Sequence, residues 1–185
     1  MSFRQFDGAD WVSIHAKAWL DWLGELIGKP NVKALELGTY EGRSACWWCE
    51  NVLTGEGSQL ACCDVWWQKD ELYQRALLNL SGLPCDVIRT STRRMLADML
   101  VAGRVFDFIY VDADHHASSV LSDMCGAWHV LKPGGIMICD DYGWTNRKRA
   151  IPPATGVNAW LDCNRDKISG YEVAANQCAI WKPLA

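Results

Sequence analysis

Short apolar segments alternate along the chain with longer segments in which apolar residues recur every three or four positions. The short segments predict buried strands, and the longer ones predict amphipathic helices. The expected strands are 32–37, 58–64, 85–89, 105–112 and 135–141. The expected helices are 11–27, 43–53, 70–80, 92–101 and 117–131. The first of these helices is capped by Asp10, and its expected buried positions are Trp11, Ile14, Ala18, Trp22 and Leu26.

Five rounds of strand followed by helix predict an α/β fold, a doubly wound, Rossmann-like sheet covered on both faces. After Asp141 the pattern changes to a polar loop over 142–156 and a short helix over 157–163. Two further strands, 168–174 and 177–182, are joined by a tight turn and should pair antiparallel at the sheet edge. We therefore expect a mostly parallel sheet in one domain, 1–185. Its expected parts are an N-terminal helical segment (1–31), a ligand-binding core (32–141), and a substrate loop with edge strands (142–185).

The composition is that of a soluble globular protein, with 50% hydrophobic and 22% charged residues. A net charge of -4 argues against a nucleic-acid partner held through phosphate contacts. The N-terminal stretch has no apolar core of a signal peptide, and no apolar run is long enough to cross a bilayer. We expect a cytoplasmic protein that binds neither nucleic acid nor membrane.

Nine cysteines are present, an odd count without the regular spacing of a secreted disulfide framework. Cys46 and Cys49 match the spacing of redox and zinc sites, but no second pair and no nearby histidine accompany them. We expect both to pack as small hydrophobic residues.

Acidic residues end four of the five expected parallel strands. They are Glu36, Asp64, Asp112 (followed by Asp114 and His115) and the pair Asp140–Asp141. A single carboxylate at a strand end is often only a helix cap. Four on one rim of a sheet, where open α/β sheets bind ligands, indicate a cationic or hydroxyl-rich ligand, a metal, or both.

The glycine turn after the first strand separates the candidate ligands. Dinucleotide-binding turns use closely spaced glycines that admit a pyrophosphate. Here Gly38 and Gly42 lie four apart, with Glu36 before them and Glu41 between them, and two carboxylates would repel a pyrophosphate. They suit an amino group, and Asp64 at the end of the second strand suits a ribose diol. An amino acid joined to a nucleoside, as in S-adenosylmethionine, fits this chemistry.

The stretch "ALELGTYEGRS" resembles motif I of class I S-adenosylmethionine-dependent methyltransferases, especially small-molecule O-methyltransferases related to catechol O-methyltransferase. The block "DFIYVDADHHASSVLSDMCGAWHVLKPGGIMICDDYGW" is similar to the fourth-to-fifth-strand region of the same group. Its "DDY" after "PGG" is most similar to the branch that contains macrolide-sugar O-methyltransferases. The resemblance implies a single methyltransferase domain and methyl transfer to a small hydroxylated molecule such as a sugar, a phenol or another natural product.

The resemblance also implies a set of cofactor contacts. Glu36, Gly38 and Tyr40 would hold the methionine end, Ser44 its carboxylate, Asp64 the ribose, and Trp66 and Ser91 the adenine. Gly42, in the turn, and Asp112, at the end of the fourth strand, complete the implied set.

Asp112, Asp140 and Asp141 match the positions that bind a divalent metal in this group, which implies Mg²⁺. Such a metal would lower the pKa of an acceptor hydroxyl. His115 matches the position of the catalytic base, and a histidine with a near-neutral pKa suits that role. Asp112 and His115 are thus the expected catalytic residues, whereas His116 is expected to be a rim residue.

Several alternatives remain open on the residues alone. In one alternative the acceptor atom is nitrogen or carbon and no metal takes part. In another the chain binds S-adenosylmethionine without catalysis. A nicotinamide-dependent reductase is disfavoured by the glycine spacing. Arg147, Lys148 and Arg149 would suit an anionic acceptor, whereas exposed tryptophans at the rim would favour a sugar or aromatic acceptor or a homodimer contact.

Overall fold

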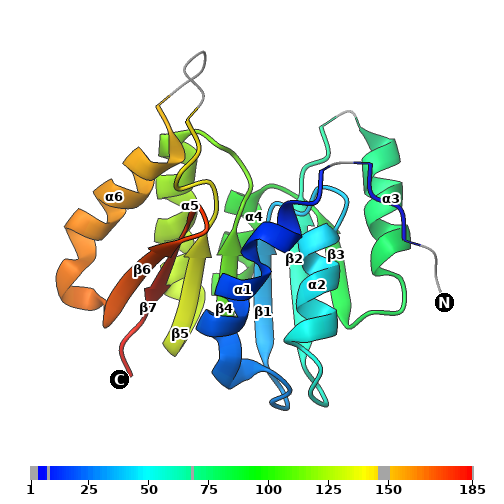
Figure 1. Ribbon diagram of the computed structural model, residues 1–185, viewed down its shortest axis with the longest axis horizontal. Coiled ribbons are helices and arrows are strands. Elements are labelled where there is room, and N and C mark those ends of the chain that lie inside the picture. The colour runs from blue at the N-terminus through cyan, green and yellow to red at the C-terminus, as the bar shows by residue number, and fades with distance from the viewer. Residues whose placement is uncertain (1–3, 8, 68, 146–150, 185) are drawn as a thin grey trace.

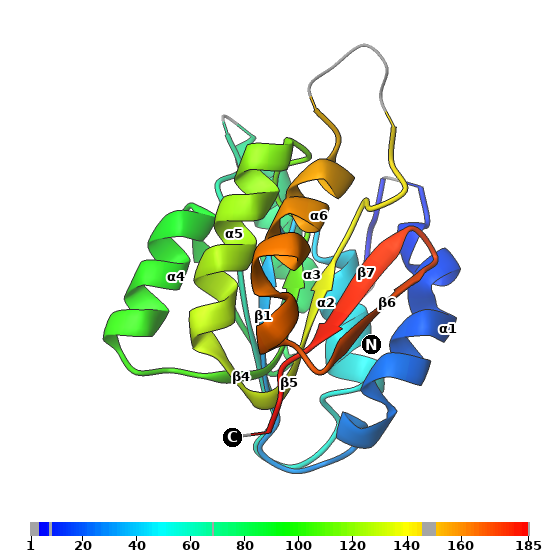
Figure 2. The same ribbon diagram turned by 90° about the vertical axis from the view of Figure 1, so that its left-hand side faces the viewer.

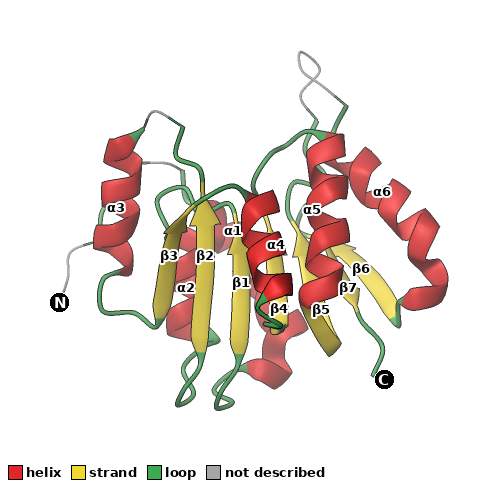
Figure 3. Cartoon of the chain, turned by 180° about the vertical axis from the view of Figure 1, so that it is seen from behind, coloured by secondary structure: helices red, strands yellow, loops and turns green. Residues whose placement is uncertain are grey.

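The described part of the chain forms one seven-stranded sheet with helices on both faces (Figures 1 and 3). The computed structural model describes residues 4–7, 9–67, 69–145 and 151–184. The strands are β1 (Lys33–Leu37), β2 (Gln59–Asp64), β3 (Cys85–Arg89), β4 (Phe106–Val111), β5 (Leu131–Cys139), β6 (Gly170–Ala174) and β7 (Gln177–Trp181). Their order is β3-β2-β1-β4-β5-β7-β6. Strands β1 to β5 pair in parallel, and β7 pairs antiparallel with both β5 and β6. The predicted fold class is confirmed.

The helices divide between two apolar cores, one on each face of the sheet. They are α1 (Trp11–Leu23), α2 (Arg43–Asn51), α3 (Asp70–Leu80), α4 (Thr92–Val101), α5 (Ala117–Val130) and α6 (Pro153–Asn164), with 3₁₀ turns at Gly24–Leu26 and Arg165–Lys167. Side chains of α4, α5 and α6 pack on one face, and those of α1, α2 and the end of α3 pack on the other (Figure 2). Along β1, Leu35 and Leu37 face the first core, whereas Ala34 faces the second. This alternation directs Glu36 toward α2.

Two elements, β5 and α6, begin four residues earlier than the sequence predicts. β5 begins at Leu131, four residues before the predicted start, and its pairing with β4 shifts register between Phe106 and Phe108. A register shift accommodates Pro133, which cannot donate a ladder hydrogen bond. α6 begins at Pro153 rather than at residue 157. Proline at the start of a helix is favourable, because the first backbone N–H groups have no intrahelical partner.

The buried face of α1 also differs from the expected one. The predicted stripe included Trp11 and Ile14, but these side chains are 65% and 58% exposed. Trp22 is buried as predicted, and the helix also buries Val12, His15, Trp19 and Leu23. Trp19 anchors this face, with its ring centroid 4.0 Å from that of Trp48 and 5.6 Å from that of Tyr110. The rotation leaves Trp11 at the sheet's carboxyl edge.

Cys46 and Cys49 are buried in α2, as expected for packing residues. Burial raises the pKa of Cys46 to about 12, and its Sγ lies 3.5 Å from the Asn79 carbonyl oxygen. Neither cysteine belongs to a group of candidate metal ligands within the described part of the chain.

None of the helices that the structure describes combines the length and the apolar character needed to span a membrane.

Candidate active site

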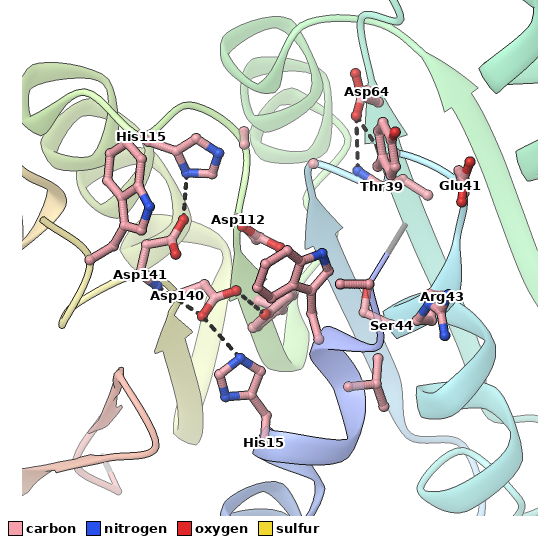
Figure 4. Close-up of a pocket in the computed structure, with 18 of the residues that line it drawn as sticks. His15, Thr39, Glu41, Arg43, Ser44, Asp64, Asp112, His115, Asp140 and Asp141 are labelled. Carbon is pink, nitrogen blue, oxygen red and sulfur yellow. Dashed lines mark hydrogen bonds and ion pairs between the residues drawn. The ribbon is translucent and has the colours of Figure 1, made fainter. Parts of the chain in front are cut away.

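A cavity of about 410 Å³ opens at the carboxyl ends of the parallel strands (Figure 4). It lies where the sheet order reverses, between neighbouring strands β1 and β4, whose helices pack on opposite faces. Ligands of open α/β sheets bind at this topological switch point. Side chains from α1, the β1–α2 turn, and the ends of β2, β4 and β5 line the cavity.

Gly38 forms the narrowest part of the turn after β1. Its φ of +94° is a conformation that side chains other than glycine rarely adopt, and its N–H donates to the Cys63 carbonyl at 2.9 Å. A Cβ at this position would lie 2.0 Å from the Asp112 carbonyl oxygen. Gly42, the N-cap residue of α2, has a φ of +82° and does not line the cavity. Gly38 therefore allows the turn to pack against the Asp112 backbone after β4. Gly42 faces away from the cavity, toward the Leu80 side chain.

The Asp64 carboxylate faces the cavity and also holds the glycine turn. Its Oδ2 accepts hydrogen bonds from the backbone N–H groups of Thr39 (3.1 Å) and Tyr40 (2.9 Å). Tyr40 has a positive φ of 49° and an exposed side chain that lines the cavity. The carboxylate thus stabilises an unusual backbone conformation at the place predicted for the ribose.

Glu36 is fully buried beneath the turn, next to Ser44, which lines the cavity. Its Oε1 accepts hydrogen bonds from Ser44 Oγ (2.6 Å) and Trp48 Nε1 (3.3 Å), whereas Oε2 has no partner among the described residues. Burial raises the pKa of this carboxyl group to about 8, although the Ser44 hydrogen bond opposes the shift. A buried acid with one unsatisfied oxygen is well suited to an ammonium group.

The raised pKa of Glu36 predicts a pH-dependent stability. The unfolded chain ionises near pH 4.5 while the folded protein keeps its proton up to about pH 8, so the folded state binds more protons between these values. The contribution of Glu36 to the free energy of unfolding should therefore fall as pH rises through this window and level off above it. We expect Glu36→Gln to remove this part of the slope. Denaturant unfolding of both proteins across the window measures it, and parallel curves would contradict the assignment.

Trp66 and Ser91, the expected adenine contacts, do not line the cavity. Trp66 is buried, with its indole N–H donating to the Tyr40 carbonyl at 2.7 Å. Ser91 is exposed and caps α4 by accepting a hydrogen bond from the Arg94 N–H at 3.3 Å. Both residues shape the surrounding segments in this structure.

Asp112, His115 and Asp141 gather at the ends of β4 and β5. Each offers one ligand atom, and these atoms lie within 4.8 Å of one another. His115 Nδ1 lies 2.5 Å from Asp141 Oδ2, and this hydrogen bond raises the pKa of the imidazole. Burial, followed by the charges of Asp140 and Asp141, raises the pKa of Asp112 well above its usual value. Such crowding of acids is relieved by a cation or a shared proton.

Asp140 lies beside this group but makes a different set of contacts. Its Oδ2 accepts from the Tyr110 hydroxyl at 2.7 Å, and its Oδ1 accepts from Gln177 Nε2 and the Asp141 N–H, both at 2.8 Å. His15 Nε2 is 3.8 Å from the same Oδ1 (Figure 4). The predicted metal ligands were Asp112, Asp140 and Asp141. The compact group in the structure contains Asp112, His115 and Asp141.

Three side chains around Asp140 were not expected from the sequence: His15, Tyr110 and Gln177. Each is buried, and together they surround Asp140. A histidine on the apolar face of α1 was the one available signal, because a buried imidazole needs a polar partner. The predicted basic run Arg147–Arg149 lies outside the described residues.

The sheet order, the glycine turn and the acidic rim define the class of the protein: a Rossmann-like methyltransferase domain. A family model described as "Methyltransferase domain" matches residues 35–142. The chain belongs to this methyltransferase-domain family. No curated protein matches the chain significantly.

Solved structures share the fold at low sequence identity. The O-methyltransferase from Bacillus cereus in complex with S-adenosylhomocysteine is 16% identical, with a TM-score of 0.68, covering 95% of this chain and 83% of its own. MycE, from the mycinamycin biosynthetic pathway, was solved with Mg²⁺, S-adenosylhomocysteine and mycinamycin VI. It is 17% identical, with a TM-score of 0.66, and the match covers 97% of this chain and 51% of MycE. A structure described as a putative rRNA methylase from Clostridium thermocellum is 13% identical, with a TM-score of 0.69, covering 90% of this chain and 96% of its own.

Proposed function

We propose that this protein uses S-adenosylmethionine to methylate a hydroxyl group of a small molecule. The observation that carries the proposal is the arrangement of acids around the Gly38 turn, with the unsatisfied Glu36 Oε2 beneath it and Asp64 beside it. These groups suit an amino group and a ribose diol and oppose a pyrophosphate. The S-adenosylhomocysteine found in the Bacillus cereus and MycE structures supports the same ligand.

In this proposal the chain's residues hold the two ends of the cofactor. Ser44 lines the proposed methionine end, Glu36 lies buried beneath it, and Gly38 lets the turn pack against the Asp112 backbone. Asp64 accepts hydrogen bonds from the ribose hydroxyls, as carboxylates at the end of the second strand do in nucleotide-binding α/β sheets. Bound S-adenosylmethionine supplies an electrophilic methyl group.

His115 is the proposed general base. Asp141 accepts a hydrogen bond from Nδ1–H, which leaves Nε2 with a lone pair for the proton of the acceptor hydroxyl. Asp141 also stabilises the imidazolium that this proton transfer produces. Because the ion pair raises the pKa of His115, the imidazole is a stronger base than free histidine.

Asp112 and Asp141, with Asp140 beside them, are proposed to hold a divalent cation, with Mg²⁺ the preferred metal for carboxylate ligands. Burial and the neighbouring carboxylates Asp140 and Asp141 raise the pKa of Asp112, which fits this assignment because a cation would relieve the repulsion among the acids. Such a cation would lower the pKa of the acceptor hydroxyl. The Mg²⁺ in the MycE structure supports the same chemistry. The acid-lined cavity disfavours nucleic acid as the acceptor.

Asp64→Ala tests the assignment of the ribose. We expect the variant to lose about 1–3 kcal/mol of S-adenosylhomocysteine affinity, because it leaves ribose hydroxyls and two turn N–H groups without their acceptor. Isothermal calorimetry measures the loss. Asp86→Ala is the matched control, since Asp86 also lies on a parallel strand but is exposed, accepts a hydrogen bond from Gln59 Nε2 and does not line the cavity. Equal affinity of the Asp64→Ala protein and wild type would reject the role of Asp64.

A further inference from the structure

The contact between Asp141 and His115, the proposed base, depends on an unusual backbone conformation just after β5. Asp141 has a φ of 57°, in the left-handed region that side chains other than glycine rarely adopt. Its carboxylate reaches His115 Nδ1 at 2.5 Å (Figure 4), and its carbonyl accepts a hydrogen bond from the Trp144 N–H at 2.9 Å. Such a conformation persists only where surrounding groups hold it. The direction of the Asp141 side chain therefore depends on the residues that restrain its backbone.

The Asp140 carboxylate is the first of these restraints. Its Oδ1 accepts a hydrogen bond from the Asp141 N–H at 2.8 Å. Its Oδ2 accepts one from the Tyr110 hydroxyl at 2.7 Å. A short acidic side chain that bonds a neighbouring backbone N–H stabilises a turn in place of regular structure. The orientation of the Asp140 carboxylate thus fixes the peptide that joins it to Asp141.

Gln177, fully buried on the antiparallel strand β7, holds the Asp140 carboxylate in turn. Its Nε2 donates to Asp140 Oδ1 at 2.8 Å and to the Tyr110 hydroxyl at 3.0 Å. Its Oε1 accepts a hydrogen bond from Trp19 Nε1 at 2.6 Å. Because an indole nitrogen only donates, Trp19 determines which end of the amide faces Asp140. A buried network with its polar groups paired in this way holds its members in one arrangement.

The hairpin that carries Gln177 also contacts the loop on the other side of Asp141. Asn176, in the turn between β6 and β7, accepts a hydrogen bond at its carbonyl from the Gly143 N–H at 3.3 Å. A Cβ at Gly143 would lie 2.3 Å from Asn176 Oδ1, so the turn and the loop are in close contact. The hairpin therefore restrains the chain both before and after Asp141.

We propose that Gln177 is a positioning residue for the proposed base: by holding the Asp140 carboxylate, it keeps Asp141 in the conformation that reaches His115. This inference rests on the proposed function, because His115 has its role only there. Gln177 does not line the cavity, and it lies outside residues 35–142, which the family model matches. The edge hairpin thus arranges the site without touching the cofactor or the acceptor.

Two measurements on the full-length protein test the inference: hydrogen exchange of the backbone amides, and NMR of the imidazole nitrogens. Gln177→Met keeps the length of the side chain and removes its amide. We expect exchange at the Asp141 amide to accelerate by roughly tenfold, the factor that corresponds to one hydrogen bond. In wild type, His115 Nδ1 should carry a proton because it donates to Asp141, and the variant should lose this preference.

Ile180→Val is the matched control. Ile180 is buried on the same strand but packs in the core beneath α4, α5 and α6, on the opposite face of β7 from Gln177. Its variant should lower the Tm and leave the Asp141 amide and the His115 imidazole as in wild type. Tyr110→Phe is the second test variant, because it removes the donor to Asp140 Oδ2, and it should change both measurements in the same direction as Gln177→Met.

A purely structural role for Gln177 would lower the Tm of Gln177→Met and leave both measurements unchanged, and that result would overturn the inference. If Gln177→Met does not fold, unchanged measurements in Tyr110→Phe overturn it instead. A wild-type His115 without a proton on Nδ1 would also contradict it. S-adenosylhomocysteine binding is recorded separately. Its absence in wild type would contradict the proposed function, whereas its presence together with any of these results would contradict the role of Gln177 alone.

Discussion

Gly38→Ala is expected to abolish cofactor binding and to destabilise the protein by on the order of 3–5 kcal/mol, at the high end for a point mutation. Two effects combine at this position. The φ of +94° is strained for alanine, and the new Cβ would lie 2.0 Å from the Asp112 carbonyl oxygen, a backbone atom that cannot rotate away. Relief requires the turn and the end of β4 to separate, which would displace both the cofactor contacts and Asp112.

Gly82→Ala separates the two effects. Gly82 also has a positive φ, of 79°, but no atom lies within 4 Å of its hypothetical Cβ. We expect this control to lose only about 1–2 kcal/mol from backbone strain and to keep its affinity for S-adenosylhomocysteine. Thermal unfolding and calorimetry of the two variants provide the comparison. Similar losses of stability in both, with cofactor binding retained by Gly38→Ala, would show that contact between the turn and β4 is unimportant.

Asp112→Asn is expected to reduce methyl transfer by about 10²–10⁴-fold, the range associated with losing a positioned catalytic group. The substitution keeps the side-chain shape but removes the charge that the proposed cation requires and that faces His115 and Asp141. The effect should appear mainly in kcat at saturating acceptor, and added Mg²⁺ should restore little of it.

Asp114→Asn provides a matched control for Asp112. Asp114 lies two residues away and is exposed. It accepts hydrogen bonds from the His116 N–H and Ser119 Oγ and does not line the cavity. Its variant should retain wild-type turnover. If both variants turn over like wild type and EDTA has no effect, the acids only shape the cavity and the cation has no catalytic role.

The parts of the fold that depend on local pattern were predictable from sequence. The central parallel strands β1, β2 and β4 read as mainly apolar runs because helices cover both faces of the sheet, and the acidic residues at or just after their ends lie on the same rim. The glycine turn could also be predicted from the sequence, because a close approach between two backbone segments requires glycine at position 38. These features are local in the chain, and the parallel topology then places them together.

The features that sequence reasoning missed depend on contacts between distant segments. Trp19 and Gln177 are 158 residues apart in the chain, yet their hydrogen bond sets the rotation of α1 and turns Trp11 toward the cavity. The periodicity of α1 permits more than one apolar stripe, and the contacts of Trp19 with Gln177 and with the Trp48 and Tyr110 rings select the observed one. The contacts of Asp140 likewise depend on Gln177, which reaches the site from the antiparallel strand β7.

The central claim is that the acid-rimmed cavity binds S-adenosylmethionine and its product. The most direct test is a calorimetric titration of S-adenosylhomocysteine into the wild-type protein, with and without EDTA, beside a titration of NAD. We predict saturable binding of one S-adenosylhomocysteine per chain, insensitive to EDTA because Glu36 and Asp64 rather than a metal hold the ligand, and no binding of NAD. A folded protein that fails to bind S-adenosylhomocysteine, or that binds NAD in its place, would contradict the account.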